Sequence, residues 1–266
     1  LVASMVGRPV RNIFPVRRQA SGEALLQVEG LSAPPRLKKA TFQLYRGEIL
    51  GIGGLIGSGR TQMVRTIFGL TSAQSGNLVV KKKRISASKG TPLSRISQGM
   101  GYLSEDRKGE GLAVTLSVAD NITLSRLSAC SRWGWLGLES QSRVSYAWMK
   151  ELDIRALSPF QQALTLSGGN QQKVALARLL HKEAEILLLD EPTRGIDIGS
   201  KIQMYESISQ CAQQGKAVLL VSSYLPELFG LCHRLGVMSR GRLSQVRSIE
   251  EWTPELVMQA AVKGEE

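Results

Sequence analysis

The segment "GLIGSGRT", residues 54–61, decides how the rest of the chain is interpreted. It follows the apolar run at residues 49–52 and precedes "TQMVRTIFGL", which is predicted to be a helix. A glycine-rich turn between a strand and a helix lets backbone N–H groups encircle phosphate oxygens, and the helix N-terminus adds partial positive charge. The pattern fits G-x-x-x-x-G-K-[ST], except that Arg60 stands where lysine is expected. The segment indicates a phosphate loop; taken alone, it is equally compatible with an ordinary strand–turn–helix connection.

A second segment, "AEILLLDEPTRGID" at residues 184–197, is more specific. Its apolar run ends in Asp190 and Glu191. A carboxylate at the carboxyl end of a buried parallel strand lies where open α/β sheets bind ligands. We expect Asp190, together with Thr61 of the loop, to hold Mg²⁺, and Glu191 to polarise an attacking water. The alternative interpretation is a solvated acidic turn after a strand. It is the weaker interpretation, because the phosphate loop and this strand end are expected to meet in space.

A third segment, "LSGGNQQKVALARLL" at residues 166–180, reads as an amphipathic helix with Ser167 as its N-cap. Gly168 and Gly169 would expose N–H groups at the positive end of this helix, an arrangement that suits a γ-phosphate. An ordinary capped helix would show the same spacing, so this segment alone leaves both interpretations open.

The remaining pattern predicts an α/β fold. Short apolar strands alternate with helices from residue 24 onward, which indicates a mostly parallel sheet covered on both faces. Strand signals vanish between about residues 108 and 180, where a helical subdomain is expected. We expect residues 1–23 to be a linker from a preceding domain and residues 24–266 to form the nucleotide-binding domain. Because Leu1 is not a natural start, the chain is expected to be part of a longer one.

Composition narrows the class of protein. No apolar run approaches the roughly 18 residues of a membrane helix, and no signal peptide is recognised at the start. Three cysteines without a CxxC pair argue against a disulfide framework or zinc site and fit a reducing compartment. The net charge of +12 leaves nucleic acid, anionic lipid and phosphate ligands open. The basic run "KKKR" at residues 81–84 has no interleaved aromatic residues, which argues against single-strand binding.

Together, these segments resemble the ATP-binding cassette of ABC transporters. "LSGGNQQK" looks like the signature motif, "ILLLDEPTRGID" like the Walker B strand with the D-loop, and "GLIGSGRT" like a variant Walker A loop. "GYLSEDRKGEGL" and "VSSYLPEL" are further similar to the second cassette of tandem-cassette ATPases that energise monosaccharide importers. The resemblance implies a P-loop NTPase core with an antiparallel β flank and an inserted helical subdomain, and ATP and Mg²⁺ as cofactors.

The resemblance assigns expected roles to individual residues. Glu105 stands in the Q-loop glutamine position and Ser223 in the switch-histidine position, and the adenine-stacking aromatic expected between residues 28 and 39 is missing. Asp190 and Thr61 are the expected Mg²⁺ ligands, and the expected catalytic positions are Glu191, Asp190, Ser223 and Glu105. The expected nucleotide-binding residues are Gly54, Gly57, Ser58, Gly59, Arg60, Thr61, Gln62, Ser167, Gly168, Gly169, Gln171 and Asp197.

These departures predict a division of labour. The resemblance implies that each nucleotide lies between the Walker A loop of one cassette and the signature of another. This chain would therefore contain two half-sites, one at its Walker A loop and one at its signature. Losing the lysine and the histidine should make its own Walker half bind ATP weakly or statically, because positioning and electrostatics supply most of the catalysis in phosphoryl transfer. Its signature would complete the site of the first cassette. Glu191 argues the other way, since a general base remains; the isolated half is expected to hydrolyse ATP slowly.

The implied partners are a first cassette, transmembrane permease subunits and, indirectly, a periplasmic or extracellular sugar-binding protein, with no nucleic acid expected. The implied location is the cytoplasmic face of the inner membrane, as a peripheral subunit. Residues 105–111 would receive the permease, although a charged surface loop would look the same. The alternative function is a soluble ABC ATPase that acts on nucleic acid or the ribosome, which the charge of +12 supports. A small-molecule kinase with a phosphate loop would not need the signature helix.

Overall fold

The computed structural model describes residues 13–17 and 22–263, and the chain divides into two compact units. One unit, called the helical unit here, comprises residues 103–184 and 192–207 together with residue 13. The other, called the sheet unit, comprises residues 14–17, 22–102, 185–191 and 208–263. Most of the predicted linker, residues 1–23, lies outside the described residues. Of its described part, Arg17 donates a hydrogen bond from Nη1 to the carbonyl of Cys232 at 2.7 Å.

The centre of the sheet unit is parallel, as the sequence predicted. Strand β10 (Ala217–Val221) lies between β3 (Ile49–Gly54) and β9 (Ile186–Asp190), and both pairings are parallel. These strands are apolar and almost entirely buried, because helices rather than water cover both faces of a parallel sheet. The register aligns Val221 with Ile52 on one side and with Asp190 on the other. The carboxyl ends of all three strands therefore meet at one edge.

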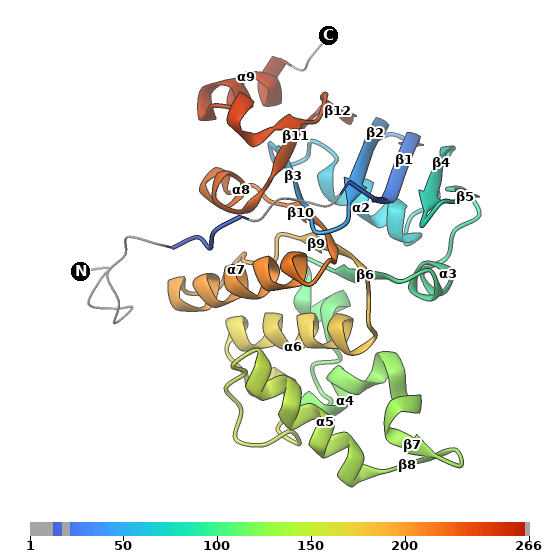
Figure 1. Ribbon diagram of the computed structural model, residues 1–266, viewed down its shortest axis with the longest axis vertical. Helices are drawn as coiled ribbons and strands as arrows, with labels where there is room; N and C mark the ends of the chain where they lie inside the picture. The colour runs from blue at the N-terminus through green and yellow to red at the C-terminus, as the bar shows by residue number, and fades with distance from the viewer. Residues whose placement is uncertain (1–12, 18–21, 264–266) are drawn as a thin grey trace. The chain divides into compact units, whose positions relative to one another are not determined.

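The antiparallel flank is also present. In the described part of the chain, eleven strands form one sheet in the order β5-β4-β1-β2-β12-β11-β3-β10-β9-β6, with β13 paired to β11. Strands β1, β2, β4 and β5 pair antiparallel with one another, whereas β2 pairs parallel with β12 on its other side. Figure 1 shows this flank in blue and green beside helix α2. The remaining strands of the sheet are β1 (Ala24–Ala33), β2 (Leu37–Tyr45), β4 (Ser75–Val80), β5 (Lys83–Ser86), β6 (Met100–Leu103), β11 (Arg234–Ser239), β12 (Arg242–Leu243) and β13 (Arg247–Ser248).

The helices of the sheet unit enclose an apolar core. Val64 and Ile67 of α2 are fully buried in one cluster with Leu50, Ile52 and Leu188 of the central strands. The phosphate-loop segment thus ends in a helix that packs on the sheet, which fixes where the loop can lie. The α-helices here are α2 (Arg60–Phe68), α3 (Pro92–Ser97), α8 (Leu225–Leu231) and α9 (Pro254–Lys263), with a 3₁₀ turn η4 (Ile249–Glu251).

The helical unit contains three helices in the range where the sequence predicts a helical subdomain: α4 (Val118–Thr123), α5 (Leu138–Glu151) and α6 (Gly168–His181). Figure 1 shows α4, α5 and α6 grouped together. Helix α7 (Ile198–Gln213) begins in this unit, and its residues from 208 on belong to the sheet unit. The shorter turns are η1 (Arg107–Gly111), a π-helix, and the 3₁₀ turns η2 (Leu124–Cys130) and η3 (Ala163–Thr165).

One local feature differs from the expectation that strands are absent here. The short strands β7 (Ser131–Arg132) and β8 (Trp135–Leu136) pair antiparallel. Trp133 and Gly134 connect them, with φ of 55° and 82°. Positive φ at both central residues is the geometry of a tight hairpin turn, and only the Trp-Gly pair signals it in the sequence. Within residues 13–17 and 22–263, no helix is long and apolar enough to span a membrane.

Candidate functional site

The phosphate loop in the sheet unit depends on glycine at two places. Gly54 and Gly59 have φ of 140° and 106°. A Cβ on Gly54 would lie 2.3 Å from the carbonyl oxygen of Met238, and one on Gly59 would lie 2.3 Å from that of Arg36. Backbone atoms cannot give way as a flexible side chain can, so both positions require glycine. The loop is therefore folded tightly against its own sheet, and helix α2 begins at Arg60 directly after Gly59.

Arg60 does not extend into solvent. Its Nη2 lies 3.3 Å from Oε1 of Glu191, and each side chain is 8% exposed. Glu191 itself has φ of 49°, a left-handed conformation that is uncommon for residues other than glycine. The residue in the lysine position is thus paired with the residue in the general-base position. The phosphate loop and the acidic strand end, which the sequence placed together, do meet here.

Asp190 occupies the last position of β9 and is fully buried. Burial raises the pKa of its carboxyl to about 6, against the lowering effect of a hydrogen bond with the Thr61 side chain; the charge of Glu191 also raises it, and Arg60 lowers it. Tyr102 donates its hydroxyl to Asp190 Oδ2 at 3.5 Å. Sequence reasoning missed Tyr102, because its place in "GYLS" predicts only that it belongs to a strand.

The site has the oxygen donors that a hard cation and a phosphate would use. Asp190 Oδ1 and Ser58 Oγ, both in this site, are among the buried side-chain atoms of the described residues that have no hydrogen-bond partner. Leaving a buried polar atom unsatisfied costs about 1–3 kcal/mol, so such atoms point to a ligand. Residues 13–17 and 22–263 contain no group of three or more His, Cys, Asp or Glu side chains that could enclose a metal ion. A Mg²⁺ ion held by one or two protein oxygens and by substrate phosphates fits this donor set.

The segment after β10 carries two serines with different surroundings. Ser223, the residue in the switch-histidine position, is exposed. Its neighbour Ser222 is fully buried, donates to Glu227 Oε2 at 2.5 Å and accepts from the backbone N–H of Tyr224 at 3.0 Å. Ser222 therefore fixes this turn. A serine at residue 223 lacks the ring nitrogen with which a histidine would contact a phosphate.

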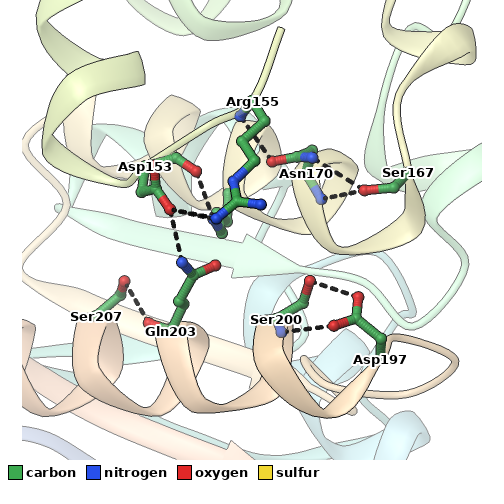
Figure 2. Close-up of polar contacts among 9 residues, drawn as sticks. Asp153, Arg155, Ser167, Asn170, Asp197, Ser200, Gln203 and Ser207 are labelled. Atoms are coloured by element: carbon green, nitrogen blue, oxygen red, sulfur yellow. Dashed lines mark hydrogen bonds and ion pairs between the residues drawn. The ribbon is translucent and has the colours of Figure 1, made fainter. Parts of the chain in front are cut away.

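The helical unit holds the other predicted residues, and Ser167 is positioned there by its neighbour Asn170. Ser167 Oγ accepts from the Asn170 side-chain amide at 2.9 Å and from its backbone N–H at 3.4 Å. The Asn170 side-chain oxygen in turn accepts from the backbone N–H of Arg155 at 2.8 Å. Figure 2 shows this chain of contacts from the 153–155 turn to Ser167. Because a hydroxyl has two acceptor sites and one hydrogen, this arrangement leaves the Ser167 O–H to act as a donor.

Gly168 and Gly169 lie in close contact with other parts of the same unit. A Cβ on Gly168 would lie 2.5 Å from Nη1 of Arg107, and one on Gly169 would lie 2.2 Å from Oγ of Ser200. The first contact is with the segment at 105–111, and the second is with the start of α7. The paired glycines thus serve close packing as well as exposing N–H groups.

Two predicted nucleotide-binding residues have other partners in the structure. Gln171 is 4% exposed and donates its amide to the carbonyl of Ala163 at 3.0 Å, so it anchors the start of α6 internally. Asp197 accepts from the backbone N–H of Ser200 at 2.9 Å and from its hydroxyl at 2.7 Å, the pattern of a helix cap at the start of α7. These hydrogen bonds lower the pKa of Asp197. A contribution of either residue to a nucleotide stays a prediction.

A polar cavity of about 580 Å³ opens beside Ser167 within this unit. Two of its lining residues bond to Asp153: the Gln203 amide donates to the Asp153 carboxylate at 2.6 Å, and Lys173 donates to the Asp153 carbonyl at 2.5 Å. Burial lowers the pKa of Lys173. The cavity is lined by Arg155, Ser167, Asn170, Lys173, Asp197, Gly199, Ser200, Ile202, Gln203 and Glu206.

Glu105, the residue in the Q-loop position, forms an ion pair with Arg194 in the same unit. The sequence placed Glu105 in the site but gave no signal for Arg194 or for the roles of Asn170 and Arg107. Their side chains act through hydrogen bonds to parts of the chain that are distant in sequence, which spacing alone does not reveal.

Comparison with known proteins assigns the family. A family model described as ABC transporter matches residues 37–194, which is more than half of the chain. The chain belongs to the ABC transporter family. A ribose import ATP-binding protein of Rubrobacter xylanophilus is 43% identical over 261 residues, covering 98% of this chain and 52% of the relative. A ribose import ATP-binding protein of Halalkalibacterium halodurans is 42% identical over 100% of this chain and 53% of its own length.

A third relative, from Agrobacterium fabrum, is named a putative ribose/galactose/methyl galactoside import ATP-binding protein and is 40% identical over 98% of this chain and 52% of its own. The chain thus spans about half the length of the curated relatives it matches.

Solved structures agree on the fold. A nucleotide-free ATP-binding cassette superposes with a TM-score of 0.73 at 18% identity, covering 88% of this chain and 97% of that one. The cassette fold predicted from the sequence is confirmed.

Proposed function

We propose that this chain is the C-terminal cassette of a tandem-cassette ATPase that powers import of a monosaccharide. The observation that carries the proposal is its identity of 43% and 42%, over nearly its whole length, to ribose import ATP-binding proteins about twice as long. The importer-like segments "SEDRKGEG" and "VSSYLPEL" support it as well. In this proposal the permease contacts residues 105–111, and the solute is chosen by proteins outside this chain.

We further propose that the sheet-unit half-site retains nucleotide without hydrolysing it quickly. Bound Mg²⁺ would neutralise phosphate charge and orient the phosphates, with Thr61 and Asp190 holding it. Arg60 and Glu191 contact each other at 3.3 Å. A phosphate that draws Arg60 must therefore compete with Glu191, and a Glu191 that stays paired is a poor acceptor for a proton from water. Ser223 offers no imidazole in the place of the switch histidine.

The helical-unit half-site is proposed to complete the nucleotide site of the first cassette. Ser167 is held with its O–H free to donate, and Gly168 and Gly169 begin helix α6, whose positive end favours an anion. Preorganised donors aimed at developing negative charge are the main source of catalysis in phosphoryl transfer. This half-site thus contributes to hydrolysis although its own unit carries no phosphate loop.

A titration of this chain with ATP and Mg²⁺ tests the first part of the proposal. We expect weak binding, and Arg60→Lys should tighten it by about tenfold, because lysine is a compact charge that cannot fork between Glu191 and the phosphates. Equal affinities for the two proteins would contradict the proposed role of Arg60. Rapid ATP turnover by the chain alone would contradict the proposal of a slow half-site.

Co-purification tests the second part. Expressed within the complete subunit, the chain should co-purify with permease subunits and support sugar uptake. The net charge of +12 supports an ATPase that acts on nucleic acid. Retention of RNA that weakens steeply with salt, without permease, would favour that function instead.

A further inference from the structure

Arg107 is the residue through which segment 105–111 contacts the signature loop, residues 166–171. Its Nη1 donates to the carbonyl of Gly168 at 2.8 Å. A Cβ on Gly195 would lie 3.5 Å from its Nη2, so the same guanidinium also packs beside the D-loop, residues 195–197. One half-buried side chain thus bonds to the signature loop and lies beside the D-loop.

The backbone that carries Arg107 is firmly hydrogen-bonded. The turn η1 is a π-helix, in which Leu112 donates to the carbonyl of Arg107 at 2.8 Å. Asp106 caps this turn by accepting from the N–H of Gly109 at 2.9 Å, and Ser104 donates to Glu110 at 2.9 Å. Single π-helical turns are rare and recur at functional sites. A segment fixed in this way moves as a unit and carries the Arg107 side chain with it.

Helix stability does not explain the contact. An arginine beside the first residue of α6 places positive charge at the positive end of the helix dipole, which disfavours the helix. The same segment also contacts the D-loop side through the ion pair of Glu105 with Arg194. Segment 105–111 therefore makes two charged contacts. One reaches the signature loop, and the other reaches Arg194, which directly precedes the D-loop.

We propose that Arg107 is a positioning residue that ties the signature loop to segment 105–111, so that displacement of the segment by a docked partner moves Gly168 and Ser167. The proposal rests on the proposed function in one respect, which is that the permease is taken to dock on this segment. Arg107 itself bonds to the loop backbone and is assigned no contact with nucleotide.

Hydrogen exchange of the 266-residue chain tests the structural part. We expect Arg107→Ala to speed exchange in the peptide covering residues 166–174 by about tenfold, because a charge-assisted hydrogen bond is lost. Arg107→Lys should recover part of the protection. Lys108→Ala is the matched control, since it removes the same charge from the neighbouring exposed residue. Equal exchange in Arg107→Ala and Lys108→Ala would overturn the proposal.

A double mutant checks that the contact is direct. Gly168→Ala places a methyl group where Nη1 of Arg107 lies, so on its own it should also speed exchange in the 166–174 peptide. In the Arg107→Ala background the methyl group meets no guanidinium and keeps only the contact of 3.3 Å with the carbonyl oxygen of Gly195, so its added effect should be smaller than in the unmutated background. Fully additive effects would show that the two residues do not interact and would overturn the proposal.

Turnover of the complete subunit assembled with its permease tests the transmission of movement. Arg107→Ala should lower the kcat for permease-stimulated ATP hydrolysis by about tenfold and change KM by less than about twofold, with partial recovery in Arg107→Lys. Altered exchange together with unchanged stimulation would overturn the transmission of movement. An unmutated complex without any ATP turnover would contradict the proposed function instead, and the exchange data would still decide whether Arg107 holds the loop.

Discussion

The two units hold their candidate half-sites by different means. In the sheet unit, the charged groups Arg60 and Glu191 are buried and face each other, beside an Asp190 whose pKa is raised. In the helical unit, Ser167 is fixed by neutral hydrogen bonds from Asn170, and its own donor remains available. The first arrangement satisfies its own charges, and the second is preorganised for a charge from elsewhere. This difference supports the proposal that one half-site of the cassette is slow and that the other contributes to hydrolysis.

The largest effect should follow from removing the Ser167 hydroxyl. In the complete subunit we expect Ser167→Ala to lower ATP turnover by about 10²-fold, because one preorganised donor to developing charge is lost. Ser117→Ala is the matched control, since Ser117 also caps a helix of this unit, α4, but in a capping box with Asp120. Similar losses of turnover in the two variants would mean that helix capping, and not donation to a phosphate, explains the effect.

In the sheet unit, an effect of similar size, on stability instead of turnover, is expected from unpairing Glu191. Arg60→Ala leaves a buried carboxylate without its cation and should lower the free energy of unfolding by about 3 kcal/mol, measured by urea denaturation. Arg84→Ala breaks the ion pair with Glu29, in which the arginine side chain is 65% exposed, and should cost less than about 1 kcal/mol. If the two variants lose the same stability, Arg60 does not stabilise Glu191.

Some features of the sheet-unit half-site could be predicted from the sequence, and others could not. The apolar runs before Gly54 and Asp190 predicted buried parallel strands, because only a sheet covered on both faces accepts such runs. The glycines and acidic residues at their ends then predicted the edge where the half-site lies. The pairing of Arg60 with Glu191 was not predictable in the same way, since it depends on the side-chain conformation of Arg60 and on the left-handed backbone at Glu191.

The helical unit was harder to predict in detail. The cap at Ser167 followed from a local pattern, and the structure has Ser167 as the N-cap of α6. The support from Asn170 and Arg155 links segments that are 15 residues apart. The hairpin at Trp133 was missed, because two-residue strands leave no alternating pattern. The sequence predicted features set by neighbouring residues, such as the helix cap. It did not predict contacts between residues that only tertiary folding brings together.

Asp190 offers a pH test of the sheet-unit half-site. Its pKa of about 6 lies above the ordinary value of 3.8, so between these values the folded protein holds a proton that the unfolded chain releases. Stability of the nucleotide-free protein should therefore fall as pH rises from about 4 to about 6, by on the order of 2 kcal/mol. Asp190→Asn should remove this fall. Parallel stability curves for the two proteins across this range would contradict the burial effect on Asp190.

The smallest effect concerns Asn170, whose side chain links Ser167 to the backbone of Arg155. Asn170→Ala should lower turnover of the complete subunit by about fivefold, the cost of one neutral hydrogen bond. Asn170→Asp should be worse, because a carboxylate would accept the Ser167 hydrogen that is needed elsewhere. Gln203→Ala, which changes another lining residue of the same cavity and removes its hydrogen bond to Asp153, should have little effect. A loss for Asn170→Asp no greater than for Asn170→Ala would contradict the proposed direction of the Ser167 O–H.

The central claim is that fast hydrolysis depends on the helical-unit half-site and not on the sheet-unit half-site of this cassette. Glu191→Gln tests it most directly, because it removes the general base while keeping a side chain that can hydrogen-bond to Arg60. Measured as permease-stimulated ATP hydrolysis by the complete subunit, Glu191→Gln should retain most of the unmutated turnover, while Ser167→Ala loses about 10²-fold. A loss for Glu191→Gln as large as that for Ser167→Ala would contradict the account.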